Sequence, residues 1–131
     1  MSTAREKVRR ELVLDTAAGG ELPITQVDYY VKQQHPSASV SDVQNETLET
    51  ILSLADDGLI VFGAMSGEGG RWEAWGGPLE KSLQKIVDVY VVHYDDRPVW
   101  AFSTWLKLTD KGEQVARALE GDTKGWLTLA R

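Results

Sequence analysis

Three pairs of residues that end helices divide the first 60 residues of this chain into three segments. The pairs are Gly19-Gly20, His35-Pro36 and Asp57-Gly58. Glycine readily takes the left-handed conformation found at helix ends, and the residue before a proline avoids the helical conformation. Apolar residues recur at helical spacing between the pairs. We therefore predict helices over about 3–18, 23–34 and 41–57.

Local start signals support the second and third helices. Thr25 followed by Asp28 fits the start of the second helix. Ser41 and Gln44 fit a capping box for the third, and Asp42 is favourably placed at the positive end of its dipole. A strand follows at about 59–65, and 71–75 is predicted to return as a second strand after a glycine-rich turn.

The segment 78–94 allows two readings. Its apolar residues fall on one helical face; they are Leu79, Leu83, Ile86, Val87, Tyr90, Val91 and Tyr94. Its second half, 86–94, is so rich in β-branched and aromatic residues that it also fits a strand. No breaker interrupts the segment, so we predict an inserted helix at about 78–94, with the strand as the alternative.

The last third of the chain is predicted to contain one strand and one helix. The strand covers about 99–108, and Thr109 begins a helix that ends near Glu120. Residues 121–131 are predicted to be a tail whose Trp126 docks on this chain or on a neighbour. The length of 131 residues and the absence of a long linker indicate a single domain at 1–120.

The charge of the chain is concentrated in one stretch. Between residues 33 and 70 there is no lysine or arginine, and there are six acids: Asp42, Glu46, Glu49, Asp56, Asp57 and Glu68. The rest of the chain holds 14 basic and 14 acidic residues, so this stretch accounts for the net charge of −6. No apolar run approaches the length of a membrane span, and the N-terminus has no apolar leader region, so we expect a cytoplasmic protein.

Two stretches resemble parts of the winged helix-turn-helix superfamily. Residues 52–63, Leu-Ser-Leu-Ala-Asp-Asp-Gly-Leu-Ile-Val-Phe-Gly, look like the end of a recognition helix turning into the first wing strand. Residues 105–119, Trp-Leu-Lys-Leu-Thr-Asp-Lys-Gly-Glu-Gln-Val-Ala-Arg-Ala-Leu, look like the returning wing strand and the next helix, a joint similar to that of MarR and PadR repressors. The resemblance implies an α+β fold: a winged-helix-like three-helix core, a β-wing and a C-terminal helix. Residues 67–98 form a longer insertion than an ordinary wing.

The resemblance also implies that the third helix would enter the major groove of DNA. Base readout relies mainly on Arg, Lys, Asn and Gln; of these the helix offers only Gln44 and Asn45, and the wing offers only Arg71. Acids share the exposed side of the helix and would face phosphates, so the charge disfavours duplex DNA as a partner. The arginines of the first helix alternate with acids and are predicted to form a solvated face.

A protein partner is the leading alternative. The candidate interface residues are Trp72, Trp75, Tyr90, Tyr94 and Trp126, because large aromatic side chains are favoured at the centres of interfaces. Trp100 and Trp105 are predicted to fill the core. The apolar segment 78–94 is a candidate seam of a homodimer, and MarR-like proteins, which this chain resembles, act as dimers.

Enzymatic chemistry has little support in the sequence. There is no cysteine, and the two histidines, His35 and His93, have no spacing typical of metal ligands. No serine or threonine lies in a recognisable nucleophile motif. We predict no catalytic, cofactor-binding or metal-binding residue. The sequence thus favours a non-enzymatic regulatory or protein-interaction module, with a DNA-binding transcriptional regulator of MarR or PadR type as the alternative.

Overall fold

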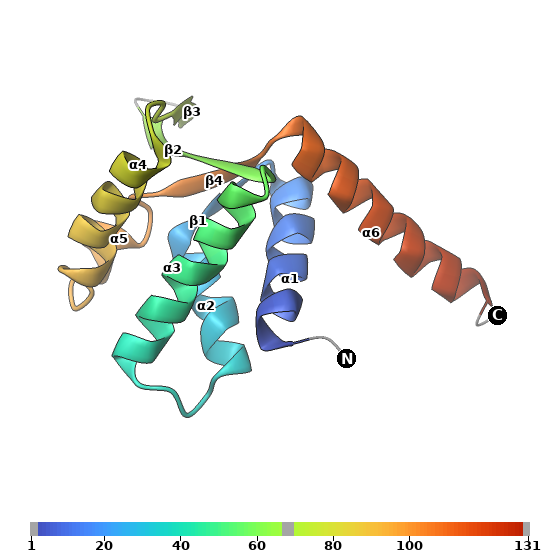
Figure 1. Cartoon of the computed structure of the whole chain (residues 1–131), viewed down its shortest axis with the longest axis horizontal. Coiled ribbons are helices and arrows are strands. Elements are labelled where there is room, and N and C mark those ends of the chain that lie inside the picture. Colours follow the sequence, from blue (N-terminus) through green and yellow to red (C-terminus); the bar gives the residue numbers. More distant parts are fainter. Residues whose placement is uncertain (1–2, 67–69, 130–131) are drawn as a thin grey trace.

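The fold combines a three-helix core, an antiparallel sheet and an insertion between two strands of that sheet (Figure 1). The computed structural model describes residues 3–66 and 70–129, with 122–129 as backbone only. In chain order the elements are α1 (Ala4–Gly19), β1 (Glu21–Pro23), α2 (Ile24–Gln34), α3 (Val40–Asp56), β2 (Ile60–Ser66), β3 (Arg71–Ala74), α4 (Leu79–Ile86), the π-helix η1 (Val87–Val91), α5 (Arg97–Trp100), β4 (Trp105–Leu108) and α6 (Asp110–Leu129). This arrangement confirms the predicted α+β class and is consistent with three helices followed by a β-hairpin wing.

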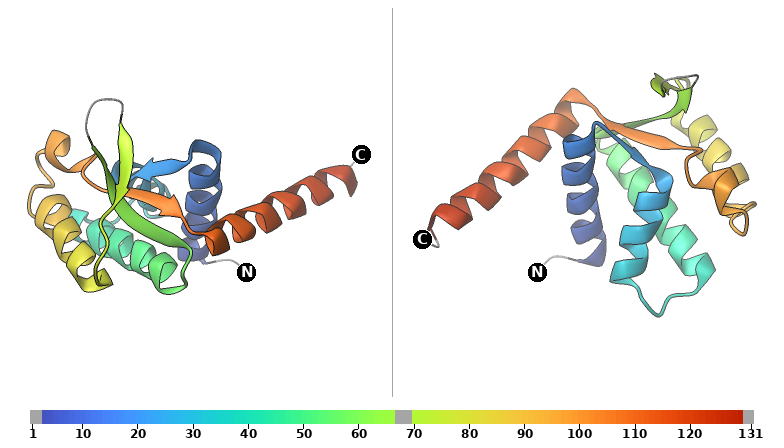
Figure 2. Two further views of the ribbon diagram at one scale, coloured as in Figure 1. Left: turned by 90° about the horizontal axis from the view of Figure 1, so that it is seen from above. Right: turned by 180° about the vertical axis from the view of Figure 1, so that it is seen from behind.

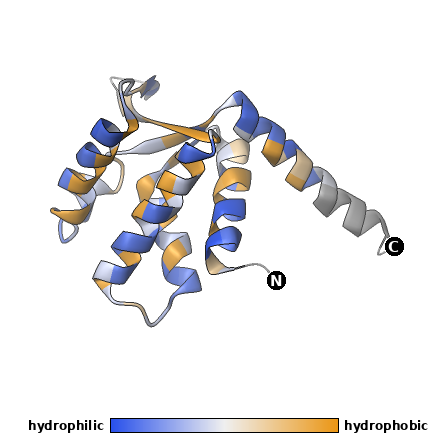
Figure 3. Cartoon of the chain, viewed as in Figure 1, coloured by the Kyte–Doolittle hydropathy of each residue, from blue (hydrophilic) through white to orange (hydrophobic). Residues whose placement is uncertain are grey.

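Helices α1, α2 and α3 enclose the apolar core. Leu12, Val27, Ile51 and Leu54, which lie on these three helices, are each at most 1% exposed. Apolar and hydrophilic residues alternate along the helices as stripes (Figure 3), as expected when one face of each helix is buried. The start of α3 differs from the prediction: the hydroxyl of Ser39, and not that of Ser41, accepts the Asp42 N–H at 3.1 Å. α2 has no side-chain cap, so Thr25 and Asp28 do not form the predicted start signal.

The sheet has the strand order β1-β4-β2-β3, and all its pairs are antiparallel. Strand β1 was not predicted, because three residues carry too weak a pattern. Its strand character comes from pairing with β4, where Leu22 lies opposite Leu106. One face of the sheet is turned to the core through buried side chains such as Leu106 and Phe62.

The two stretches that carry the winged-helix resemblance lock together. Gly58 has φ +75°, which fits its predicted role at the end of α3. Its carbonyl accepts the Thr109 hydroxyl at 2.5 Å, and the Leu59 carbonyl accepts the Thr109 N–H at 3.0 Å. Gly112 packs so closely on this turn that a β-carbon there would lie 2.1 Å from the Leu59 carbonyl oxygen. The glycine at this joint is thus required by close approach of two backbones.

The insertion between β2 and β4 contains β3, α4, η1 and α5. Its helix confirms the predicted helix near 78–94 over the strand alternative, although the second half continues as a π-helix. The predicted strand at 99–108 is wrong in its first half: residues 97–100 form a helical turn, and the strand covers only Trp105–Leu108. Pro98 favours the first turn of a helix, and Trp100, which is 3% exposed, anchors this turn in the core.

The last helix is longer than predicted. We expected it to end near Glu120, but α6 continues to Leu129, so residues 121–129 do not form an irregular tail. Gly121 lies inside this helix and is exposed. An exposed glycine weakens a helix, but it ends the helix only where it takes the left-handed conformation. The beginning of α6 packs against α1, and its end extends away from the rest of the molecule (Figure 2).

Candidate functional site

The exposed face of α3 is acidic. Asp42, Asn45, Glu49 and Asp56 are exposed along it, whereas Gln44 is only 8% exposed. Of the predicted DNA contacts, Asn45 is therefore accessible and Gln44 is largely buried. The third, Arg71, is exposed on β3, which lies far from the beginning of α3 (Figure 1). The structure does not bring these three residues together on one surface.

Two arginines of α1 are bound to acids of α3 and of the turn after it. Arg5 donates to both carboxylate oxygens of Glu46, at 2.8 and 2.9 Å, and to Glu49 at 2.6 Å. Arg9 pairs with Asp57 at 2.5 Å. These arginines do not form the predicted solvated face. The hydrogen bonds from Arg5 hold the pKa of Glu46 below its ordinary value, because they favour the carboxylate.

A buried carboxylate fastens the insertion to the helical core. Asp28 of α2 is 3% exposed and accepts the hydroxyl of Tyr90 at 2.6 Å and that of Tyr94 at 3.1 Å. Lys32 pairs with the same carboxylate at 2.7 Å. The Tyr90 hydroxyl also lies 3.2 Å from that of Thr47 on α3. Burial raises the pKa of Tyr90 well above its ordinary range, so this phenol stays protonated.

Three of the residues predicted to form a partner interface make contacts inside the molecule instead. Tyr90 is fully buried, and Tyr94 is half-buried and stacks on Trp100 with ring centroids 5.1 Å apart. Trp75 is also half-buried and lies beneath Lys85, whose Nζ is 4.9 Å from its ring centroid. Tyr90 and Tyr94 connect the insertion to α2, and Trp75 packs against the apolar core. Trp72 lies elsewhere, on the sheet, and the side chain of Trp126 is outside the described part of the chain.

The face of the sheet turned away from the helices carries exposed aromatic residues. Trp105 was predicted to be in the core, but it is half-buried on this face, 5.9 Å between ring centroids from Phe102. Phe102 is 62% exposed. Trp72 lies over Gly63 on the same face, with the Nζ of Lys107 5.0 Å from its ring centroid. The alternation of Trp105, buried Leu106, Lys107 and buried Leu108 was the signal for this outer face.

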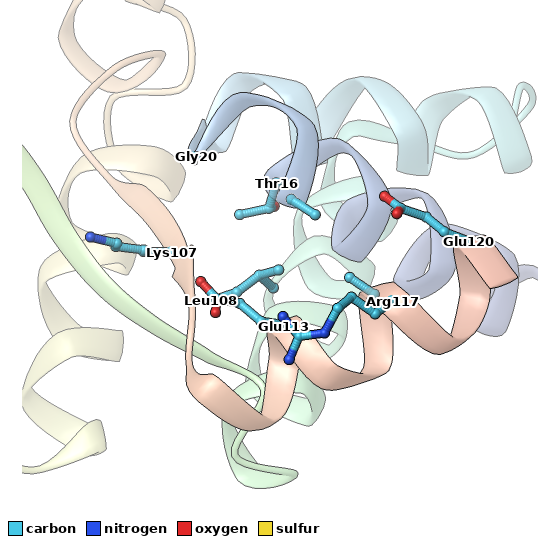
Figure 4. Close-up of a pocket in the computed structure, with 9 residues that line it drawn as sticks. Thr16, Gly20, Lys107, Leu108, Glu113, Arg117 and Glu120 are labelled. Atoms are coloured by element: carbon cyan, nitrogen blue, oxygen red, sulfur yellow. The ribbon is translucent and has the colours of Figure 1, made fainter.

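A hollow of about 390 Å³ lies between α1, β4 and α6 (Figure 4). Lys107 and Arg117 line it together with Glu113 and Glu120, so its charges are of both signs. Among the described residues that line it, the one with a hydroxyl is Thr16, which donates to the Leu12 carbonyl at 2.6 Å. Within 3–66 and 70–129 no three His, Cys, Asp or Glu side chains are grouped as metal ligands. The described lining of the hollow therefore brings together charges of both signs but no group of metal ligands.

No protein-family model matches this chain, and no curated protein or solved structure matches it. Among the described residues no helix has the length and apolar character needed to cross a membrane. Three surface features of the described residues are available to a partner: the acidic face of α3, the aromatic outer face of the sheet and the open edge of β3.

Proposed function

We propose that this chain is a non-enzymatic regulatory or protein-interaction module built on a winged-helix-like frame. The observation that carries the proposal is the electrostatic character of α3. Its exposed face carries Asp42, Glu49 and Asp56, and Arg5 and Arg9 beside it are already bound to acids. A helix of this kind lacks the free cations that bring a recognition helix to DNA.

The energetics of phosphate binding support this proposal. Affinity for duplex DNA comes largely from cations that replace the counterions of the phosphates. If Arg5 turned to a phosphate, it would leave Glu46 and Glu49, with which it makes three hydrogen bonds. Glu46 has a half-buried side chain, so the loss of its partner would carry a desolvation cost. The net charge of −6 further repels the polyanion at long range.

Exposed apolar side chains support a protein partner. Phe102 is 62% exposed, and its ring centroid lies 5.9 Å from that of the half-buried Trp105. Val61 is 41% exposed and lies opposite Lys107 on the same face of the sheet. Exposed aromatic and aliphatic groups that are contiguous indicate an interaction surface. Aromatic residues also contribute strongly at the centres of protein interfaces. A homodimer or another protein partner is the binding mode that we favour.

A titration of labelled random duplex, followed by fluorescence anisotropy at low salt, tests the proposal. We expect no binding at tens of micromolar protein. In the variant Asp42→Lys/Asp56→Lys, nonspecific binding should appear, because two cations replace two acids on the face of α3. Asp95→Lys/Asp96→Lys is the control, with the same change of charge in an exposed turn of the insertion.

Two results would contradict the proposal. One is micromolar binding by the unmodified protein with a steep dependence on salt, weakened by Asn45→Ala. That result would favour the alternative, a transcriptional regulator of MarR or PadR type that reads duplex DNA. The other is equal stimulation by the two double variants, which would show that net charge, and not the face of α3, controls binding.

A further inference from the structure

Strand β3 is an open edge of the sheet. It is the terminal strand in the order β1-β4-β2-β3, and the side chains of Arg71, Glu73 and Ala74 are exposed. Edge strands present unpaired backbone groups to which another strand can be added. Natural edges are commonly protected by a proline, a bulge, short length or charged side chains. Arg71–Ala74 contains no proline, and its two charged residues, Arg71 and Glu73, are of opposite sign.

The pairing of β3 with β2 determines which of its backbone groups are free. Glu73 lies opposite Ala64, Arg71 lies opposite Ser66, and the Trp75 N–H donates to the Phe62 carbonyl at 3.0 Å. In an antiparallel pair, alternate residues direct both backbone groups to the same neighbour. Arg71 and Glu73 therefore direct theirs to β2, and the N–H and C=O of Trp72 point out of the sheet at its free edge.

We propose that β3 pairs antiparallel with β3 of a second copy of this chain, with Trp72 opposite Trp72 of that copy. The two Trp72 residues then exchange a pair of backbone hydrogen bonds, and the two four-stranded sheets become one continuous sheet. This inference rests on the proposed function, since it names the protein partner as a second copy.

Charge complementarity selects this register. With Trp72 on the two-fold axis, Arg71 of each copy lies directly opposite Glu73 of the other, on the same face of the sheet. Opposite charges that face each other across strands stabilise the pairing, and like charges destabilise it. A shift that places Glu73 on the axis sets Glu73 opposite Glu73, and a shift that places Arg71 there sets Arg71 opposite Arg71. Each of these two neighbouring registers keeps backbone hydrogen bonds but brings like charges together.

Charge reversal tests the pairing by sedimentation equilibrium up to high micromolar concentration. We expect the unmodified protein to dimerise reversibly. Arg71→Glu or Glu73→Arg should each weaken the dimer about tenfold, because symmetry turns two attractive pairs into two repulsive ones. The double variant Arg71→Glu/Glu73→Arg should regain the original association. Arg117→Glu, which changes the charge equally at an exposed position of α6, should dimerise like the unmodified protein.

Mixing the two single variants gives the most specific result. In a homodimer of either single variant, the residues at positions 71 and 73 that face each other carry like charges and repel. In a heterodimer of Arg71→Glu with Glu73→Arg, both facing pairs carry opposite charges. The mixture should therefore form a heterodimer. A mixture that stays monomeric, or an unmodified protein that is monomeric at high micromolar concentration, overturns the pairing. Either result leaves the duplex titration unchanged, so failure of this inference is distinct from failure of the proposed function.

A cross-link provides a second test, because the chain contains no cysteine. Residues in a hydrogen-bonded antiparallel pair have α-carbons about 5.5 Å apart, which is within the range for a disulfide. Trp72→Cys should therefore form a covalent dimer on mild oxidation. Val40→Cys, at a position that is 55% exposed on α3, should stay largely monomeric. Equal cross-linking of the two variants would contradict the proposed contact.

Discussion

The hydroxyl of Tyr90 donates to the Oδ1 of Asp28 at 2.6 Å, and the two residues are 62 positions apart in the chain. Both are buried, at 0% and 3% exposure. This bond joins the insertion to α2, and Lys32 balances the charge of the carboxylate. A buried carboxylate with three partners restrains the position of the insertion, since any displacement leaves a charge unpaired.

Tyr90→Phe should lower the free energy of unfolding by about 1.5–3 kcal/mol, because it removes a hydrogen bond to a charged, buried acceptor. Tyr29→Phe is a matched control: Tyr29 is 51% exposed and accepts a hydrogen bond from Gln33. Its effect should stay within about 0.5 kcal/mol. Urea denaturation measures both. Equal effects of the two substitutions would show that the bond between Tyr90 and Asp28 contributes little.

The ion pair between Arg5 and Glu46 should make stability depend on pH in the acid range. The pKa of Glu46 is lowered from its ordinary value of 4.5 in the folded protein. The unfolded chain therefore binds the proton more readily, and the stabilisation is fully present above the unfolded pKa. It is lost as the pH falls through the lower, folded pKa.

Arg5→Met should flatten this loss of stability below pH about 5 and lower stability at neutral pH, since Glu46 then titrates closer to its unfolded pKa. Denaturation curves at a series of acidic pH values measure the slope. Arg117→Met, at an exposed position on α6, is the control and should keep the slope of the unmodified protein. An unchanged slope in Arg5→Met would assign the acid sensitivity to other carboxylates.

Local backbone chemistry made part of this fold predictable. The end of α3 at Gly58 and the beginning of α6 at Thr109 depend on residues adjacent in sequence, and both were placed within a few residues. β1 depends instead on pairing with β4, more than 80 residues later, so its three residues show no pattern of their own. The two tyrosine partners of Asp28 are also remote in the chain, so the sequence around Asp28 indicates only a helix start and not its role in holding the insertion.

The candidate surfaces were predictable only in part. Composition alone located the acidic stretch, and the structure places several of its residues along the exposed face of α3. Trp100 and Trp105 could not be told apart, because both lie in an apolar segment. In the structure this segment forms a helical turn followed by a strand. Trp100 lies on the turn and packs into the core, whereas Trp105 lies on the strand and faces outward.

The two tryptophans should respond differently to truncation. Trp100→Ala should cost about 3–5 kcal/mol, because Trp100 is 3% exposed, packs between Tyr90 and Tyr94 and donates to the Tyr94 carbonyl at 2.8 Å. Trp105→Ala should cost clearly less, since its ring is partly in water. Urea denaturation followed by far-ultraviolet circular dichroism measures both without relying on tryptophan fluorescence. A larger cost at Trp105 would contradict the assignment of that residue to the outer face.

Two glycines on α6 provide the sharpest contrast. A β-carbon at Gly112 would lie 2.1 Å from the Leu59 carbonyl oxygen, whereas one at Gly121 would meet nothing within 4 Å. Gly112→Ala should therefore destabilise the protein by about 2–4 kcal/mol, because β2 and α6 must separate. Gly121→Ala should be neutral or stabilising by up to about 1 kcal/mol, since alanine favours the helix. Thermal and urea denaturation of both variants measure the difference, and a neutral Gly112→Ala would show that the turn at Leu59 and the first turn of α6 are not in tight contact.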